Sequence, residues 1–196
     1  RLSAQAIAFN MVGRSAITRD PDWKNGQYAD KGPEQGLAIA RMVGHITYLS
    51  QMLLDAKFGR KLQSADRLSY NFGSEFAIES YLDHKGSAFT RRFDANSYLY
   101  ITKAMDYFDI TRSYGPLKEA FKQVTARCLF VSYSSDWLFP TAQSLEMVRA
   151  MLSNTGRVSF IEIDSPYGHD AFLVEAEKLT RILKGFLGGV AEEEAP

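Results

Sequence analysis

The fold of this 196-residue chain is decided by two similar stretches, RCLFVSYSSDWLFP at residues 127–140 and RVSFIEIDSPYGHD at residues 157–170. Each opens with a short apolar run that has strand preference and closes with a polar loop. Each is followed by apolar residues at helical spacing, over 141–152 and over 170–187. The order strand, helix, strand, helix predicts an α/β fold with a parallel sheet and flanking helices.

An acid and a histidine follow the two predicted strands, 127–133 and 157–163. Asp136 lies in the first loop and His169 in the second. Functional groups gather beyond the carboxyl ends of parallel strands, so we expect these two side chains to meet, with the carboxylate orienting the imidazole. Taken alone, Asp136 fits a helix N-cap and His169 a structural histidine. In this order, the two together favour a catalytic pair, two members of a Ser-His-Asp triad.

The nucleophile of such a triad is missing from the sequence. No Gly-x-Ser-x-Gly motif occurs, and Ser74, the nearest imitation, follows no predicted strand, so we expect it to cap a helix. In the order Ser, Asp, His the serine comes first. Since the chain also begins with Arg1 instead of Met, we expect it to be part of a longer polypeptide whose earlier residues supply the serine.

Composition narrows the possible partners. Apolar residues make up 45% of the chain, which excludes a disordered protein, and 23 basic residues balance 23 acidic ones, which gives no basic field for nucleic acid or an anionic membrane. No secretory or membrane-spanning segment is expected. The single Cys128 is interpreted as a buried, reduced thiol of a cytoplasmic protein, and no ligand spacing predicts a metal site.

Several motifs resemble the homoserine O-acetyltransferase family of the α/β-hydrolase fold. They are GHITYLS at 44–50, KFGR at 57–60, SDWLFP at 135–140 and GHDAFL at 168–173, together with the opening RLSAQ at 1–5. The resemblance covers nearly the whole chain. It implies the C-terminal part of an α/β-hydrolase with an inserted helical lid, organised as a core helix at 1–24, the lid at 25–115, the C-terminal core at 116–190 and an acidic tail at 191–196. The last helix is expected to end at Gly188-Gly189.

The resemblance implies acetyl transfer from acetyl-coenzyme A to the hydroxyl of L-homoserine, a step toward methionine. The route would be a ping-pong reaction through an upstream serine, His169 and Asp136. Acetyl-coenzyme A is then a co-substrate, and no permanently bound cofactor is expected. The lid, rich in aromatic residues, is expected to pair with its copy in a homodimer.

The amino-acid acceptor should meet groups matched to its charges. Arg41 and Tyr48 are seven positions apart on one predicted helix, so they share a face, where a guanidinium can grip a carboxylate. The resemblance implies that both bind the homoserine carboxylate and that Asp170 binds its amino group. Without it, a surface charge, a core aromatic and an N-cap are the favoured interpretations. Of the other histidines, His45 is expected to pack or to lie on the helix surface, and His84 to be solvated.

Alternatives to this function stay open at the level of sequence. Close relatives could carry succinyl in place of acetyl, or accept L-serine in place of homoserine. An α/β-hydrolase esterase would share Asp136 and His169 without needing Arg41 and Tyr48. A chain without a nucleophile could also be a non-catalytic binding module.

Overall fold

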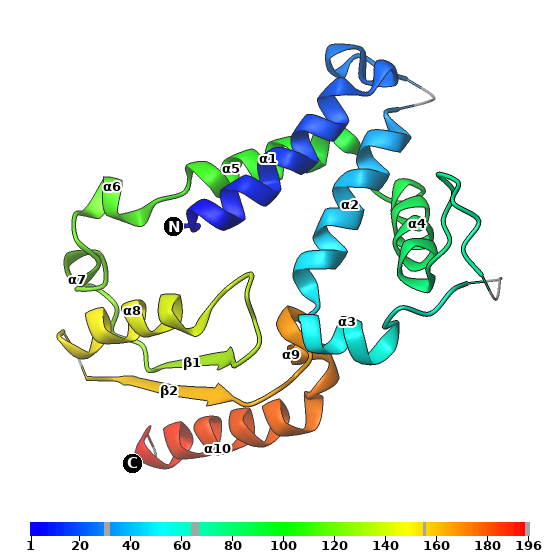
Figure 1. Cartoon of the computed structure of the whole chain (residues 1–196). Coiled ribbons are helices and arrows are strands. Elements are labelled where there is room, and N and C mark those ends of the chain that lie inside the picture. Colours follow the sequence, from blue (N-terminus) through cyan, green and yellow to red (C-terminus); the bar gives the residue numbers. More distant parts are fainter. Residues whose placement is uncertain (30–31, 64–66, 155, 195–196) are drawn as a thin grey trace. The chain divides into compact units, whose positions relative to one another are not determined.

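The chain forms two compact units in its computed structural model (Figure 1). The structure describes residues 1–29, 32–63, 67–154 and 156–194. Unit 1 comprises Arg1–Thr47 and Gln51–Asp109, and unit 2 comprises Tyr48–Ser50 and Ile110–Pro196. The chain therefore leaves unit 1 for three residues, which belong to unit 2.

Unit 1 is helical. Its elements are α1 (Ala4–Arg19), η1 (Pro21–Gly26), α2 (Glu34–Tyr48), α3 (Gln51–Lys57), α4 (Ala77–Thr90) and α5 (Ala95–Tyr107), the last residue of α2 lying in unit 2. Helix α1 is capped by Ser3, whose hydroxyl accepts the Ala6 N–H at 3.1 Å, and it ends before Asp20-Pro21.

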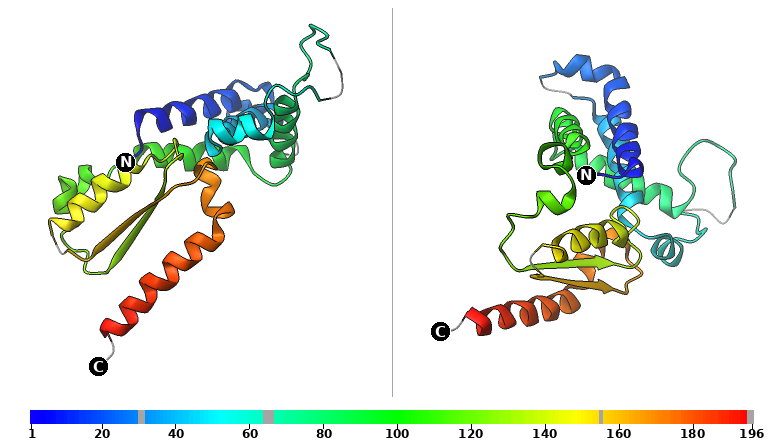
Figure 2. Two further views of the ribbon diagram at one scale, coloured as in Figure 1. Left: turned by 60° about the horizontal axis from the view of Figure 1, so that its bottom comes forward. Right: turned by 90° about the vertical axis from the view of Figure 1, so that its left-hand side faces the viewer.

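Helices α1 and α5 lie side by side (Figures 1 and 2). The Arg14 guanidinium contacts the Asp106 carboxylate at 2.5 Å, and this pair is largely buried. The core of unit 1 is formed by residues from three helices and the α5 N-terminus, namely Ile17, Leu37, Ala40, Phe89 and Ala95. Burial of these apolar side chains is the main source of stability for such a unit.

The helix that carries Arg41 and Tyr48 is interrupted. Apolar residues over 34–58 predict one long helix with a break near Gly44, but α2 continues through Gly44 to Tyr48 and α3 begins at Gln51. The break therefore falls at Leu49 and Ser50, and both of these residues are buried in unit 2. The position of the break is therefore set by the burial of Leu49 and Ser50 in unit 2 and not by Gly44.

Unit 2 is built on two parallel strands. Its elements are α6 (Ile110–Tyr114), α7 (Leu117–Ala120), β1 (Cys128–Tyr133), α8 (Thr141–Leu152), β2 (Val158–Ile163), η2 (Gly168–Asp170), α9 (Ala171–Val174) and α10 (Ala176–Glu194). Strands β1 and β2 pair in register, with Tyr133 opposite Ile163 at their carboxyl ends. The predicted strand, helix, strand, helix order and the parallel pairing are confirmed.

The two strands lie between helices. Helix α8 runs along one side of the strands and α10 along the other (Figures 1 and 2). The core on the α10 side joins Tyr133, Ile163 and Ala171, with Ile182 of α10 packed against them. This packing fixes the ends of both strands, from which the two polar loops emerge.

The C-terminal helix differs from the prediction at both ends. The expected helix over 170–187 is divided at Glu175 into α9 and α10. The prediction that Gly188-Gly189 ends it is wrong, because α10 continues to Glu194. Neither glycine has the positive φ of a C-terminal cap, and a glycine inside a helix is tolerated at a modest cost. Of the expected acidic tail, residues 195 and 196 lie outside the described residues.

Helix α1 packs on α5, and both belong to unit 1, which extends to Asp109. The predicted division into core, lid and tail stays a prediction.

Cys128, expected to be buried, is half-buried, with its Sγ 3.7 Å from the Ala126 carbonyl oxygen. Within the described ranges, no helix is both long and apolar enough to cross a membrane.

The contact between α1 and α2 at Gly36 generates a stability prediction. A Cβ at Gly36 would lie 2.5 Å from the Ala16 carbonyl oxygen, so Gly36→Ala should lower the free energy of unfolding by about 1–3 kcal/mol. Gly185→Ala on α10, where a Cβ meets nothing within 4 Å, should raise it by up to about 1 kcal/mol. Urea unfolding followed by circular dichroism measures both, and equal effects would contradict the close approach.

Candidate active site

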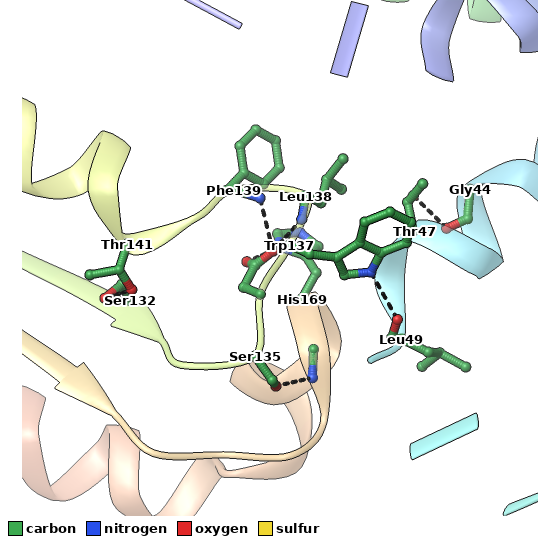
Figure 3. Close-up of polar contacts among 12 residues, drawn as sticks. Gly44, Thr47, Leu49, Ser132, Ser135, Trp137, Leu138, Phe139, Thr141 and His169 are labelled. Carbon is green, nitrogen blue, oxygen red and sulfur yellow. Dashed lines mark hydrogen bonds and ion pairs between the residues drawn. The ribbon is translucent and has the colours of Figure 1, made fainter. Parts of the chain in front are cut away.

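The loop after β1 presents Asp136 in a fixed orientation. Its Oδ1 accepts the backbone N–H groups of Leu138 at 3.0 Å and Phe139 at 2.9 Å (Figure 3). The side chain is 7% exposed. An aspartate that bonds the backbone two and three residues ahead forms a local turn, and this turn leaves Oδ2 available for another donor.

The loop after β2 carries His169 in the short helix η2. Gly168, directly before it, has a φ of 73°, a left-handed conformation that favours glycine. The turn at Gly168 directs the chain from the strand end into η2. His169 thereby lies near the carboxyl end of β2, beside the loop that holds Asp136.

Asp136 and His169 form a hydrogen-bonded pair. His169 Nδ1 lies 2.8 Å from Asp136 Oδ2, which confirms the expectation that the two side chains meet. An ionised carboxylate only accepts hydrogen bonds, so Nδ1 carries the proton and Nε2 of the neutral ring keeps its lone pair. The imidazole is thus held in the tautomer that a general base requires.

Aromatic rings surround the imidazole. Ring centroids lie 5.1 Å away for Phe139, 5.6 Å for Phe172 and 5.9 Å for Tyr48. His169 remains 28% exposed, while Asp136 is almost covered. The buried carboxylate and the half-exposed ring leave one side of the imidazole accessible to a reacting group.

A cavity of about 300 Å³ lies on this side of unit 2. Asp136 and His169 line it together with Phe139, Phe172 and Tyr133. Burial, and then the charge of the Glu175 carboxylate, raise the pKa of the Tyr133 hydroxyl, which therefore stays neutral at physiological pH. Tyr133 thus lines the cavity as a neutral side chain.

The described residues provide no nucleophile bonded to His169. Within residues 1–29, 32–63, 67–154 and 156–194, no hydroxyl or thiol is hydrogen-bonded to its ring. Ser74 contacts the Asp83 carboxylate and is not the helix cap that was expected, since α4 begins after Phe76 and is capped by Glu79. The pair Asp136–His169 is two thirds of a triad in this chain.

The three predicted substrate residues lie in different surroundings. Arg41 and Tyr48 share α2, as expected, but Arg41 belongs to unit 1, where its guanidinium lies 4.7 Å from the Phe89 ring centre. Tyr48 belongs to unit 2 and contacts the His169 ring. Asp170 directly follows His169 in η2 and makes no side-chain cap bond to α9. Their substrate roles stay predictions.

Two serines that sequence reasoning missed connect the loops of Asp136 and His169. The Ser135 hydroxyl donates to the Ser165 carbonyl at 2.5 Å. It also accepts the Gly168 N–H at 2.9 Å, which is the bond drawn from Ser135 in Figure 3. Ser134 donates to Asp164 Oδ1 at 2.7 Å and accepts the Ser165 N–H at 3.1 Å. In the sequence, only the two hydroxyl residues directly before Asp136 could have indicated these contacts. The backbone groups that they bind have no sequence signature.

His45 is a packed histidine. It is 8% exposed, and its ring meets the edge of Tyr81 at a centroid distance of 5.7 Å. Burial, reinforced by the positive charge of Arg41, lowers the pKa of His45 to about 4. His84 is exposed, as expected. Among the described residues, no group of His, Cys, Asp and Glu side chains is arranged to hold a metal ion.

An acid and a histidine that follow successive parallel strands and bond to each other define a site of the α/β-hydrolase class. Solved structures support this fold. The chain is similar to homoserine O-acetyltransferase from Bacillus anthracis, with a TM-score of 0.86 at 23% identity over 95% of this chain and 50% of that one. It is also similar to esterase E22, with a TM-score of 0.82 at 20% identity over 94% and 51%.

Sequence comparison is more specific. The chain is 53% identical over 195 residues to the homoserine O-acetyltransferase of Rhodospirillum rubrum, covering 98% of this chain and 50% of that protein. No protein-family model matches. The chain spans about half the length of the curated relatives that it matches. Over that half it is a homologue of the homoserine O-acetyltransferases, which confirms the resemblance carried by its motifs.

The pKa of His45 generates a pH prediction. In the unfolded chain a histidine titrates near pH 6.5, so between pH 6.5 and 4 the unfolded state binds more protons than the folded state. The contribution of His45 to the free energy of unfolding should therefore be complete above pH 6.5 and should decrease as the pH drops toward 4. Thermal unfolding of His45→Gln should show a flatter pH dependence than the wild-type protein between pH 6.5 and 4. An equal pH dependence of the two proteins would contradict the lowered pKa assigned to His45.

Proposed function

We propose that this chain supplies the general base, its orienting acid and the acceptor-binding residues of a homoserine O-acetyltransferase. One observation carries the proposal: His169 Nδ1 is bonded to Asp136 Oδ2, which leaves Nε2 with its lone pair, and both residues line one cavity. The homology to proteins of that name supports the choice of reaction. The nucleophilic serine would come from polypeptide outside residues 1–196.

The first half-reaction would load the acetyl group onto that serine. His169 Nε2 takes the serine proton as the oxygen attacks the thioester carbonyl of acetyl-coenzyme A. The C–S bond then breaks, and the coenzyme A sulfur leaves with the proton from His169. Asp136 holds the ring orientation and stabilises the imidazolium that forms between these steps.

The second half-reaction would repeat the proton transfer with a different oxygen. His169 takes the proton of the L-homoserine side-chain hydroxyl, whose oxygen attacks the acetyl-serine carbonyl. The serine oxygen leaves and recovers the proton, and the acetyl ester of homoserine departs. Coenzyme A leaves before homoserine reacts with the acetyl-serine, so the kinetics would be ping-pong.

The acceptor would be held by its two charges. Arg41 offers a guanidinium that can bind a carboxylate through two parallel hydrogen bonds, and Tyr48 adds a hydroxyl. Asp170 offers a carboxylate for the ammonium group. The position of Asp170, next in sequence to His169, supports this role because it keeps the amino acid close to the base.

The remaining predictions concern the cellular setting. We propose a cytoplasmic enzyme of methionine biosynthesis that forms a homodimer through its helical segment. Exposed apolar side chains on α5 are compatible with a pairing surface, namely Tyr100, Ile101, Met105 and Tyr107. Sedimentation analysis of the purified protein measures the oligomeric state.

An activity assay separates the alternatives. The assay needs a complete enzyme, which we define as residues 1–196 joined to the part of the Rhodospirillum rubrum relative that they do not match, and call the reconstituted enzyme. Release of coenzyme A that depends on L-homoserine supports the transferase. Release without an acceptor indicates an esterase-like hydrolase, and preference for succinyl-coenzyme A or for L-serine identifies the corresponding relative.

Replacement of the general base is the first mutational prediction. His169→Ala in the reconstituted enzyme should lower kcat by about a thousandfold or more, because the proton acceptor for both half-reactions is lost. His84→Ala, which removes an exposed histidine, should leave kcat unchanged. Near-normal turnover of His169→Ala would contradict the assignment of the base.

Replacement of Arg41 tests the acceptor site. Arg41→Ala should raise KM for L-homoserine about 10- to 100-fold, as expected when a charge-assisted bond worth about 1.5–3 kcal/mol is lost, and should leave acetyl loading intact. Arg92→Ala is the matched control, since this exposed guanidinium also lies over the Phe89 ring, at 5.6 Å. Equal KM values for the two variants would exclude Arg41 as the carboxylate ligand.

A further inference from the structure

Residues Tyr48–Ser50, here called the strap, join two long stretches of unit 1 but belong to unit 2. Leu49 is 6% exposed and Ser50 is 5% exposed. A connection between two helices usually runs over the surface, because buried loop backbone must find hydrogen-bond partners. The burial of the strap therefore requires an explanation in its contacts.

The strap is bound to the loop that carries the catalytic acid. The indole Nε1–H of Trp137, the residue after Asp136, donates to the Leu49 carbonyl oxygen at 3.0 Å (Figure 3). This carbonyl lies just beyond the end of α2, where helix carbonyls lack partners within the helix. Trp137 thus satisfies a buried acceptor and connects the strap to the Asp136 loop.

The strap is also bound to the loop that carries the histidine. The Ser50 hydroxyl donates to the Pro166 carbonyl oxygen. A Cβ at Gly168 would lie 2.5 Å from the Ser50 nitrogen and 2.8 Å from the Tyr48 carbonyl oxygen, so the backbone of the strap lies directly against the residue before His169. Gly168 is required here both by its φ and by this close approach.

We infer that the strap positions the Tyr48 ring against His169, with Trp137 and Ser50 as the positioning residues that hold it. Tyr48 begins the strap, and its ring centroid lies 5.9 Å from that of His169. The Asp136–His169 bond does not depend on the strap, because Asp136 is oriented by the backbone of Leu138 and Phe139. Loss of the strap contacts should therefore displace Tyr48 while the acid–base pair persists.

The kinetic consequence rests on the proposed function. If Tyr48 helps to bind the acceptor, release of the strap weakens acceptor binding and spares acetyl loading, which uses the serine, His169 and Asp136 but no acceptor contact. Trp137 and Ser50 would then determine KM for L-homoserine without touching it. A residue needed only for folding would lower both half-reactions together through the amount of active enzyme.

The structural test uses the 196-residue chain. Trp137→Phe removes the indole N–H, and Ser50→Ala removes the hydroxyl. In both variants, nuclear magnetic resonance should show loss of the nuclear Overhauser effect between the Tyr48 and His169 rings, while the His169 Nδ1 proton keeps its downfield signal. Trp23→Phe is the matched control, because Trp23 donates the same N–H to Asn96 at 3.1 Å in unit 1. It should keep the ring contact.

The kinetic test uses the reconstituted enzyme. Each strap variant should raise KM for L-homoserine about tenfold, as expected for one lost buried hydrogen bond, with acetyl loading within about twofold of wild type. Trp23→Phe should match wild type in both values. If circular dichroism shows that one strap variant does not fold, the other variant tests the strap inference.

The outcomes distinguish the two hypotheses. A wild-type ring contact in the folded strap variants would overturn the strap inference, as would an equal loss of the downfield His169 signal. A reconstituted enzyme that loads acetyl but transfers none to L-homoserine would overturn the proposed function, and the magnetic resonance result would still decide the strap inference.

Discussion

In-register pairing of β1 and β2 is the constraint on which the rest of unit 2 depends. Because the strands are parallel and end opposite each other at Tyr133 and Ile163, the loops that follow emerge at the same edge. The Ser134 N–H continues the ladder by donating to the Ile163 carbonyl at 3.0 Å. A shift of register would separate the acid from the imidazole, so backbone hydrogen bonds of the sheet set the geometry of the Asp136–His169 pair.

The two loops are then held by groups that take no part in proton transfer. Backbone N–H groups orient the Asp136 carboxylate, and the Ser135 hydroxyl bridges to the backbone on both sides of the turn at Gly168. The strap adds contacts from a distant part of the sequence. A preorganised site of this kind holds its geometry before substrate binds, which reduces the reorganisation needed during reaction.

The sequence predicted much of this arrangement. The strands, helix α8 and the meeting of Asp136 with His169 follow from local apolar patterns and from the rule that functional groups gather at strand ends. The errors occur where tertiary contacts override a local pattern. The glycines at 44 and 188–189 suggested helix ends, yet α2 and α10 pass through them, and the helix break at Leu49–Ser50 has no strong sequence signal.

The sequence by itself determined the strand, helix, strand, helix order of unit 2 and the two residues that meet at the strand ends, Asp136 and His169, because these depend on side-chain type and short-range spacing. Only the tertiary structure decided how the loops of Asp136 and His169 are fixed. The partners of Trp137, Ser50 and Ser135 are backbone groups remote in sequence, at Leu49, Pro166 and the Ser165–Gly168 turn. Every residue has a carbonyl, so no residue type marks which one will be bound.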